Sequence, residues 1–230
     1  MRFHLAKSDS VLAGNSLGAR AFYQVVRWIV VAFCRTWLRL SVKGVENIPT
    51  SGAFILAPVH RSTMDIPIAA AVTRRRMRFM GKDSLWRIKI VGSGFSALGA
   101  FPVTRGSADL EALKRCIAFV NAGEPLVLFP EGTRQVGDMI APLFDGAAYV
   151  ALKTQVPIIP VGIGGSQDVM PSGSAKIRRL RCAAVVGTPI YPATTSGSRA
   201  PRGDVRDLTE RLNAALQVLL AEALTISRQK

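Results

Sequence analysis

Residues 124–135 read EPLVLFPEGTRQ, and this stretch decides the fold because an apolar run leads directly into polar chemistry. Its apolar part, residues 125–130, is typical of a strand that is buried on both faces, as in a parallel sheet. The residues that follow at once are Glu131, Gly132, Thr133 and Arg134. A hydrophobic core requires none of them, so we expect a site for a polar ligand here.

Similar apolar segments recur on both sides of this stretch and alternate with helical patterns. Strand-like segments occupy residues 41–49, 52–58, 77–81, 97–103, 156–165 and 177–190. Helical patterns occupy residues 20–39, 65–72, 107–121 and 205–226, the last after a Pro-, Ser- and Gly-rich loop. Asp65 is placed to cap the second of these helices, with Pro67 in its first turn. Such alternation predicts an α/β fold.

The composition limits the classes of protein that this chain can be. Its 230 residues, 49% of them apolar, are enough to bury the core of one domain. Thirty Lys and Arg against 15 Asp and Glu give a charge of +15, which favours an anionic partner such as a membrane surface, nucleic acid or a phosphorylated substrate. The cysteines, Cys34, Cys116 and Cys182, indicate buried thiols in a reducing compartment rather than disulfides or zinc ligands. The opening residues lack the apolar region of a secretory signal.

The N-terminal helix pattern is basic on one side and apolar on the other. Its most apolar part, residues 25–34, is interrupted at Arg27, short of the ~18 to 20 apolar residues that a membrane-spanning helix needs, so we expect no span. On a helix, one arc of about 120° holds Arg20, Gln24, Arg27, Arg35 and Arg39. The opposite side holds Phe22, Val26, Ile29, Phe33 and Trp37. We expect residues 1–40 to form a helix in the interface of an anionic membrane, the alternative being a surface helix packed on the core.

A histidine and an aspartate stand on either side of the first strand-to-helix turn. His60 and His4 are the two histidines of the chain, and His4 lies in the N-terminal tail, so His60 is the candidate general base. Asp65 is five residues on and can bind one ring nitrogen, which leaves the other free to accept a proton. No G-x-S-x-G nucleophile motif is present, so such a pair suits activation of a hydroxyl on the substrate. The alternative is that Asp65 caps its helix and His60 is an ordinary loop residue.

Four segments together resemble the motif blocks of the glycerolipid acyltransferase family. They read HRSTMD at residues 60–65, GAFPVTR at 99–105, FPEGTR at 129–134 and VPIIPV at 156–161. Within this family the resemblance is strongest to the 1-acylglycerol-3-phosphate acyltransferases. The chain departs from the family pattern at Val59, Pro102 and Gln135. The resemblance implies a mixed central sheet flanked by helices, with the acyltransferase domain at residues 41–230.

The resemblance also implies a reaction and its two central residues. His60 would take the proton from an acceptor hydroxyl, and Asp65 would orient the imidazole. The hydroxyl would then attack an acyl thioester directly, without a cofactor or metal. The implied donor is acyl-CoA or acyl carrier protein, and the implied acceptor is lysophosphatidic acid, which becomes phosphatidic acid. Glycerol-3-phosphate, another lysophospholipid or a glycolipid are the alternative acceptors.

The remaining site residues are carried over from the second and third blocks. The residues implied to bind the acceptor and its phosphate are Lys82, Thr104, Arg105, Glu131, Gly132, Thr133 and Arg134. Glu131 would hold the glycerol hydroxyl, while guanidinium forks at Arg105 and Arg134 would pair with phosphate. An ion pair with Asp138 or Asp145 is the alternative for Arg134. The small residues of segment 92–101 leave room for an acyl groove, or else belong to a packed helix.

The sequence also bears on two competing functions, nucleic-acid binding and a covalent acyl-cysteine mechanism, and on where the protein resides. A nucleic-acid-binding protein would explain the +15 charge and the run TRRRMR at residues 73–78, but aromatic residues make up only 7% and do not interleave with the basic ones. We therefore expect no nucleic-acid partner. A covalent acyl-cysteine mechanism would have each cysteine compete for the same histidine. We expect a peripheral or monotopic protein at the cytoplasmic face of the membrane, in contact with anionic phospholipids.

Overall fold

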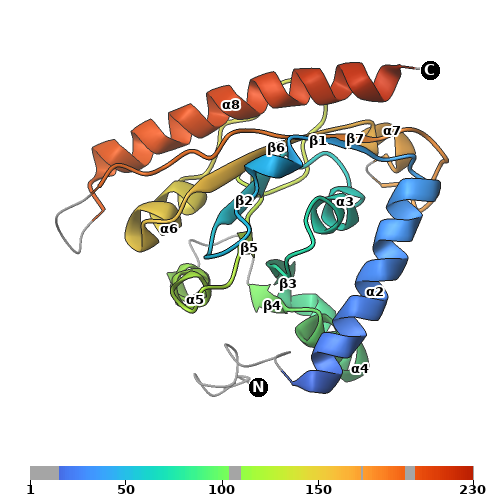
Figure 1. Ribbon diagram of the computed structural model, residues 1–230, viewed down its shortest axis with the longest axis horizontal. Coiled ribbons are helices and arrows are strands. Elements are labelled where there is room, and N and C mark those ends of the chain that lie inside the picture. The colour runs from blue at the N-terminus through green and yellow to red at the C-terminus, as the bar shows by residue number, and fades with distance from the viewer. Residues whose placement is uncertain (1–15, 104–109, 172, 195–199, 230) are drawn as a thin grey trace.

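The computed structural model describes residues 16–103, 110–171, 173–194 and 200–229, and within them seven strands form one sheet (Figure 1). The strands are β1 (Ser41–Lys43), β2 (Ile55–Pro58), β3 (Arg78–Lys82), β4 (Ala100–Val103), β5 (Leu126–Val127), β6 (Ile158–Gly164) and β7 (Ala183–Val186). Their order is β1-β7-β6-β2-β5-β3-β4, with β6 and β7 antiparallel and all other neighbours parallel. The predicted α/β fold with a mixed sheet is confirmed.

Helices flank the sheet (Figure 1). They are α2 (Leu17–Thr36), α3 (Asp65–Ala71), α4 (Lys89–Ala97), α5 (Leu110–Asn121), α6 (Gly146–Thr154), α7 (Ser166–Val169) and α8 (Arg202–Arg228), with 3-10 turns at Val45–Asn47 and Asp83–Arg87. In Figure 1 the central strands run between α5 and α6 on one side and α3, α4 and α2 on the other, with α8 along the top. The sequence did not predict α6 and α7.

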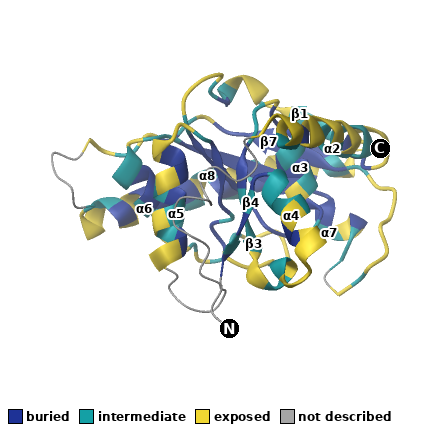
Figure 2. Cartoon of the chain, turned by 90° about the horizontal axis from the view of Figure 1, so that it is seen from below, coloured by how far each residue is buried: buried dark blue, intermediate teal, exposed yellow. Residues whose placement is uncertain are grey.

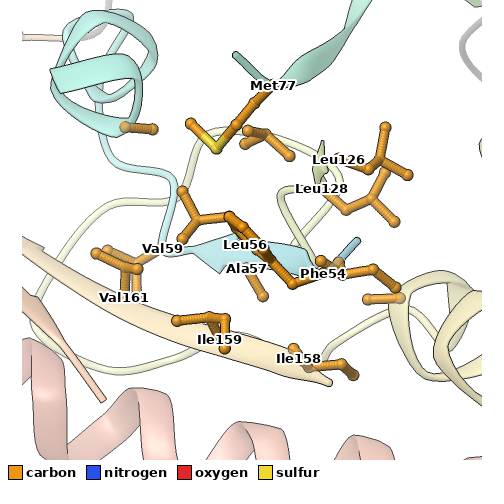
Figure 3. Packing of buried hydrophobic residues seen from close by; sticks show 14 of the residues in the cluster. Phe54, Leu56, Ala57, Val59, Met77, Leu126, Leu128, Ile158, Ile159 and Val161 are labelled. Carbon is orange, nitrogen blue, oxygen red and sulfur yellow. The ribbon is translucent and has the colours of Figure 1, made fainter. Parts of the chain in front are cut away.

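The continuous apolar strands form the centre of the core because helices cover both of their faces. All residues of β2 and β6 are buried. Figure 3 shows Leu56 of β2 packed between Met77 and the β6 residues Ile158 and Ile159. On β6, glycine permits the close approach of α8, since a Cβ at Gly162 would lie 2.2 Å from the backbone oxygen of Leu219.

The late strand is shorter than predicted. The sequence indicated a strand over residues 177–190, whereas β7 begins at Ala183 and residues 175–182 have no regular secondary structure. Residues 176–181 read KIRRLR, and all but Arg181 among them are exposed. Four cationic side chains in six residues are costly to bury in a sheet flanked by helices, so the strand starts only where the charges end.

Helix α2 packs on the protein with the side that contains Arg27. Tyr23 and Cys34 are buried there, and Arg27 Nη2 donates a hydrogen bond of 2.7 Å to the Thr73 carbonyl. Arg27 therefore differs from the other arginines of its arc, because the contact with Thr73 turns it inward. The exposed side is largely apolar, with Leu17 85%, Val25 60%, Trp28 72% and Ile29 55% exposed.

The length and apolar composition of α2 also meet the requirements for a membrane-spanning helix. The interruption at Arg27 therefore does not exclude a span, contrary to what the sequence led us to expect. Core helices and signal sequences share these two properties. Exposure of the apolar side of α2 is, by contrast, a property of the folded molecule.

Candidate active site

The polar motif residues gather at one edge of the sheet because the strands that deliver them are parallel. Strand β5 pairs with β2 at Val127 and Leu56, and with β3 on its other side. His60 comes two residues after the end of β2, Glu131 four residues after the end of β5, and Lys82 is the last residue of β3. Ligands of open α/β sheets bind at such carboxyl ends.

His60 and Asp65 form a buried hydrogen-bonded pair. His60 Nδ1 lies 3.1 Å from Asp65 Oδ2, and the two residues are 7% and 0% exposed. The same carboxylate oxygen accepts hydrogen bonds from the backbone N–H groups of Arg61 and Ser62. Asp65 thus closes the turn that precedes α3. It does not cap the helix as the sequence indicated, since Met64 occupies the cap position and makes no side-chain cap bond.

These contacts determine which nitrogen of His60 is free. An ionised carboxylate only accepts hydrogen bonds, so the neutral imidazole carries its proton on Nδ1 and leaves Nε2 as the acceptor. The ring stacks on Phe129, with the centroids 4.2 Å apart and the planes at 29°. The Gln135 N–H donates to the His60 carbonyl over 2.8 Å. Stacking and backbone bonds together hold the ring in one orientation.

Glu131 is buried and binds protein groups, not solvent. Its Oε2 accepts the His60 backbone N–H at 2.8 Å, and Arg61 Nη1 lies 2.7 Å from Oε1 and 2.8 Å from Oε2. Arg61 also donates to the carbonyls of Gly137 and Met139, at 3.0 and 2.9 Å. In this structure Glu131 therefore holds the His60 loop. The sequence had led us to expect its carboxylate to bind the glycerol hydroxyl instead.

Arg61 is a site residue that sequence reasoning missed. Its side chain is 2% exposed and joins the first motif block to the third through Glu131. A signal was present, because an arginine directly after His60 and a glutamate directly after an apolar run both require a partner if the fold buries them. Only the fold shows that they are partners of each other, since 70 residues separate them.

Arg134 lies at the surface beside the turn that carries His60. Its Nη1 donates a 3.0 Å hydrogen bond to Thr63 Oγ1, which uses one of the five N–H donors of the guanidinium. The alternative of an ion pair does not hold among the described residues, since Asp138 pairs with Arg228 and Asp145 accepts from Thr209. Arg134 thus keeps donors for a ligand next to the candidate base.

Other residues of the third block are exposed around Arg134. Gly132 has a left-handed φ of 67°, and a Cβ there would lie 2.7 Å from the Phe144 ring, so this position suits glycine. Thr133 is exposed, and its Oγ1 accepts a hydrogen bond of 3.0 Å from Gln135 Nε2. The block therefore presents a turn with exposed polar groups on one side and buried Glu131 on the other.

Lys82 and the described part of the second block lie on the strands two and three places from β2 in the sheet. Lys82 is exposed, and β5 lies between its strand and β2, so the backbones of Lys82 and His60 are separated by about 10 Å across the sheet. Thr104 and Arg105 lie outside the described residues. β4, which leads into them, runs parallel to β3 and pairs Val103 with Lys82, so the second block also leaves the sheet at this edge.

The glycine- and serine-rich segment 92–101 packs around an indole ring. Residues up to Ala97 belong to α4. A Cβ at Gly92 would lie 2.8 Å from Trp86, and Trp86 Nε1 donates to Ser96 Oγ at 3.0 Å. Of the two expectations for this segment, the packed helix is the one observed, because the space left by its small residues holds Trp86.

The cysteines and the potential metal ligands also bear on the chemistry. Burial raises the pKa of the Cys34 and Cys182 thiols to about 12, so neither is poised as a thiolate nucleophile. Among the described residues, no three His, Cys, Asp or Glu side chains gather as metal ligands would.

A cavity of about 280 Å³ lies between α2 and the loop after α5 and is separate from His60. Its lining residues are Arg20, Tyr23, Gln24, Arg76, Gly123, Glu124 and Pro125.

Comparison with known proteins links this site to one family. The sequence profile described as Acyltransferase matches residues 39–164. A chloroplastic 1-acyl-sn-glycerol-3-phosphate acyltransferase from Brassica napus is 31% identical over 142 residues, which are 60% of this chain and 41% of that protein. The enzyme of the same description from Bacillus subtilis is 27% identical over 196 residues, or 81% of this chain and 95% of that one.

A solved structure is also similar. The crystal structure of the 1-acyl-sn-glycerophosphate acyltransferase PlsC from Thermotoga maritima matches with a TM-score of 0.70 and 25% identity, over 90% of this chain and 82% of that chain. The chain spans about two fifths of the length of the plant relatives, 41% for Brassica napus and 40% for Arabidopsis thaliana. The family match over residues 39–164 includes all four motif segments.

Proposed function

The chain belongs to the acyltransferase family, and from this premise we propose that it transfers a fatty acyl group to lysophosphatidic acid, giving phosphatidic acid. The donor is an acyl thioester of coenzyme A or of acyl carrier protein. The observation that carries the proposal is the buried pair of His60 Nδ1 and Asp65 Oδ2, 3.1 Å apart, which makes Nε2 of the same ring a proton acceptor.

The proposed reaction is a direct transfer with His60 as the base. Nε2 takes the proton of the acceptor hydroxyl while its oxygen bonds to the thioester carbonyl carbon. The tetrahedral intermediate then collapses, the carbon–sulfur bond breaks, and the thiolate leaves. The imidazolium returns its proton to that sulfur, so His60 ends the cycle neutral. Asp65 stabilises the imidazolium through Nδ1.

We assign the acceptor phosphate to the cationic groups at the carboxyl edge of the sheet. Arg134 supports this assignment because it lies beside the His60 turn and bonds to Thr63. Lys82 and the second-block residues Thr104 and Arg105 are the proposed further phosphate ligands. Glu131 is proposed to act by positioning His60 and Arg61, since its carboxylate is 0% exposed and bonded to both.

We also propose that residues 1–40 hold this domain at the cytoplasmic face of a membrane. Lysophosphatidic acid resides in the bilayer, so the site must approach it there. The apolar exposed side of α2, with Trp28 at 72% exposure, supports a helix seated in the interface. Residues 41–230 then form the acyltransferase domain.

Mass spectrometry of the products tests the proposed function. Purified protein would be offered lysophosphatidic acid, glycerol-3-phosphate, another lysophospholipid or a glycolipid, each with acyl-CoA and with acyl carrier protein as donor. We expect phosphatidic acid from lysophosphatidic acid at the highest rate. A higher rate with a different acceptor would replace the proposed substrate, and no acyl transfer to any acceptor would contradict the proposed reaction.

A further inference from the structure

The loop between α7 and β7 carries a basic segment that the acyl-transfer chemistry does not use. Residues 176–181 read KIRRLR, and we call them the basic loop. Lys176, Arg178 and Arg179 are exposed, while Ile177 and Leu180 expose 38% and 40% of their surface. Figure 2 shows this stretch as an exposed loop beyond α7. In the described part of the chain, the three exposed cations form no ion pair.

The basic loop lies against the C-terminal end of α2. The guanidinium carbon of Arg179 is 5.9 Å from the centroid of the Trp37 ring, which is itself 44% exposed. Directly after the loop, the N–H of Cys182 donates to the Leu38 carbonyl over 2.8 Å. Figure 1 shows the loop reaching the end of α2 that lies nearest α7. The two segments are therefore one surface, although about 140 residues separate them in sequence.

The charge of this surface is increased by α2 itself. Arg35 in its last turn and Arg39 just beyond it are both exposed. The apolar exposed side of α2, with Val25, Trp28 and Ile29, adjoins this basic end. Cations next to exposed apolar and indole side chains are the combination that binds the headgroup region of an anionic bilayer.

We propose that the basic loop is a second membrane contact, which binds anionic phospholipid headgroups beside the end of α2. This inference rests on the proposed placement of α2 in the interface, and it adds a contact that is remote in sequence from the N-terminal helix. Lys176, Arg178 and Arg179 meet the anionic headgroups. Ile177 and Leu180 enter the interface between them.

The loop is also connected to the candidate active site. The Arg178 N–H donates to the Val169 carbonyl at 2.9 Å, and Ser62 Oγ donates to the Met170 carbonyl at 2.8 Å. Ser62 belongs to the turn that Asp65 closes. A loop bound to headgroups therefore holds the His60 turn close to the leaflet that contains the lipid acceptor.

Substitutions that remove the positive charges of the basic loop, made in the full chain, test the proposal by vesicle flotation. The test variant is K176Q/R178Q/R179Q. The matched control, R202Q/R206Q/R211Q, removes three exposed cations from the N-terminal half of α8, which Figure 1 shows at the far end of the molecule from α2. A second control, K176R/R178K/R179K, keeps the charge of the loop. Vesicles of phosphatidylglycerol with phosphatidylethanolamine are compared with neutral phosphatidylcholine vesicles, at low and high salt, and circular dichroism checks the fold of each variant.

Each cation near an anionic leaflet contributes about fivefold to partitioning, so we expect the test variant to bind anionic vesicles at least tenfold more weakly. The α8 control and the charge-conserving variant should bind as the unchanged protein does, and the difference should shrink in high salt. Equal losses in the test and α8 variants would overturn the proposal, because net charge alone would then explain binding. Unchanged binding of the test variant to anionic vesicles would also overturn it. Flotation requires no acyl transfer, so it remains decisive if the proposed reaction is wrong.

Discussion

The guanidinium of Arg61 lies 2.7 Å from the carboxylate of Glu131, and the two side chains are 2% and 0% exposed. Glu131 also accepts the backbone N–H of His60, so this ion pair joins the turn that carries the base to the loop that follows β5. A buried pair of charges is costly to desolvate and is strongly destabilising when one partner is lost. The pair therefore makes the position of His60 dependent on two motif blocks at once.

Removal of Glu131 should destabilise the protein far more than removal of an exposed acid. Glu131→Ala leaves Arg61 as a buried unpaired cation, and we expect the free energy of unfolding to fall by about 3 to 5 kcal/mol. The matched control is Glu210→Ala, which breaks the exposed pair with Arg206 and should cost less than about 1 kcal/mol. Urea unfolding followed by circular dichroism measures both.

The double replacement R61M/E131L distinguishes an ion pair from two independent contributions. It removes both charges and keeps apolar volume, so we expect it to cost less than the sum of R61M and E131L alone. Additive losses in this double-mutant cycle, or a cost of Glu131→Ala no larger than that of Glu210→Ala, would contradict the role assigned to the pair.

Much of the fold was predictable because local patterns specify it. The continuous apolar runs at residues 52–58 and 125–130 identified β2 and β5, and the alternation of elements identified the α/β class. The side of α2 that packs on the protein was not predictable. A helical wheel separates two faces of a helix, but only the folded structure, with Tyr23 and Cys34 buried and Arg27 bonded to Thr73, shows which face turns inward.

The candidate site was predictable to a similar extent. The spacing of His60 and Asp65 indicated their contact, since five residues around a turn bring a carboxylate back to the ring. The partner of Glu131 was not predictable, because Arg61 is 70 residues away and only the parallel pairing of β2 with β5 brings the two together. The late strand was overestimated because Ile177 and Leu180 come just before the apolar residues 182–186 in sequence, although they belong to an exposed loop.

Arg134 should be required for phosphorylated acceptors. Arg134→Ala removes charge-assisted hydrogen bonds worth about 1.5 to 3 kcal/mol, so we expect KM for lysophosphatidic acid to rise about 10- to 100-fold. Monoacylglycerol lacks the phosphate, so any residual use of it should change little. Arg206→Ala on α8 removes the same charge from an exposed position and serves as the control. Equal losses for both acceptors would remove Arg134 from the phosphate site.

The cysteines should be unreactive in the native protein. Burial raises the pKa of Cys34 and Cys182 to about 12, so at pH 8 only about one thiol in ten thousand is ionised. Because these pKa values are raised, reactivity should appear only as the pH approaches 12 or when the protein unfolds. We expect iodoacetamide to label the protein in urea but not in buffer at pH 8. The variant C34S/C116S/C182S should retain acyl transfer, and loss of transfer by this folded variant would favour the acyl-cysteine mechanism.

The exposed apolar side of α2 should seat the protein on vesicles. We expect W28S/I29S to bind liposomes at least tenfold more weakly, because burial of each large apolar side chain contributes about 1.5 to 3 kcal/mol. Val218→Ser on α8 removes an apolar side chain that is 68% exposed and should have no effect on binding. Deletion of residues 1–40 should reduce binding further. If vesicle flotation gives the same result for W28S/I29S and the unchanged protein, the membrane contact lies elsewhere and α2 is a packing helix.

The assignment of His60 as the general base is the central claim, and one measurement tests it most directly. The rate of phosphatidic acid formation from lysophosphatidic acid and an acyl thioester is compared between the unchanged protein and His60→Ala, with the fold checked by circular dichroism. Loss of a general base costs about 100- to 10,000-fold, so we expect a folded variant with at least a 100-fold lower rate, and a smaller loss for Asp65→Asn. Substantial transfer by folded His60→Ala would contradict the account.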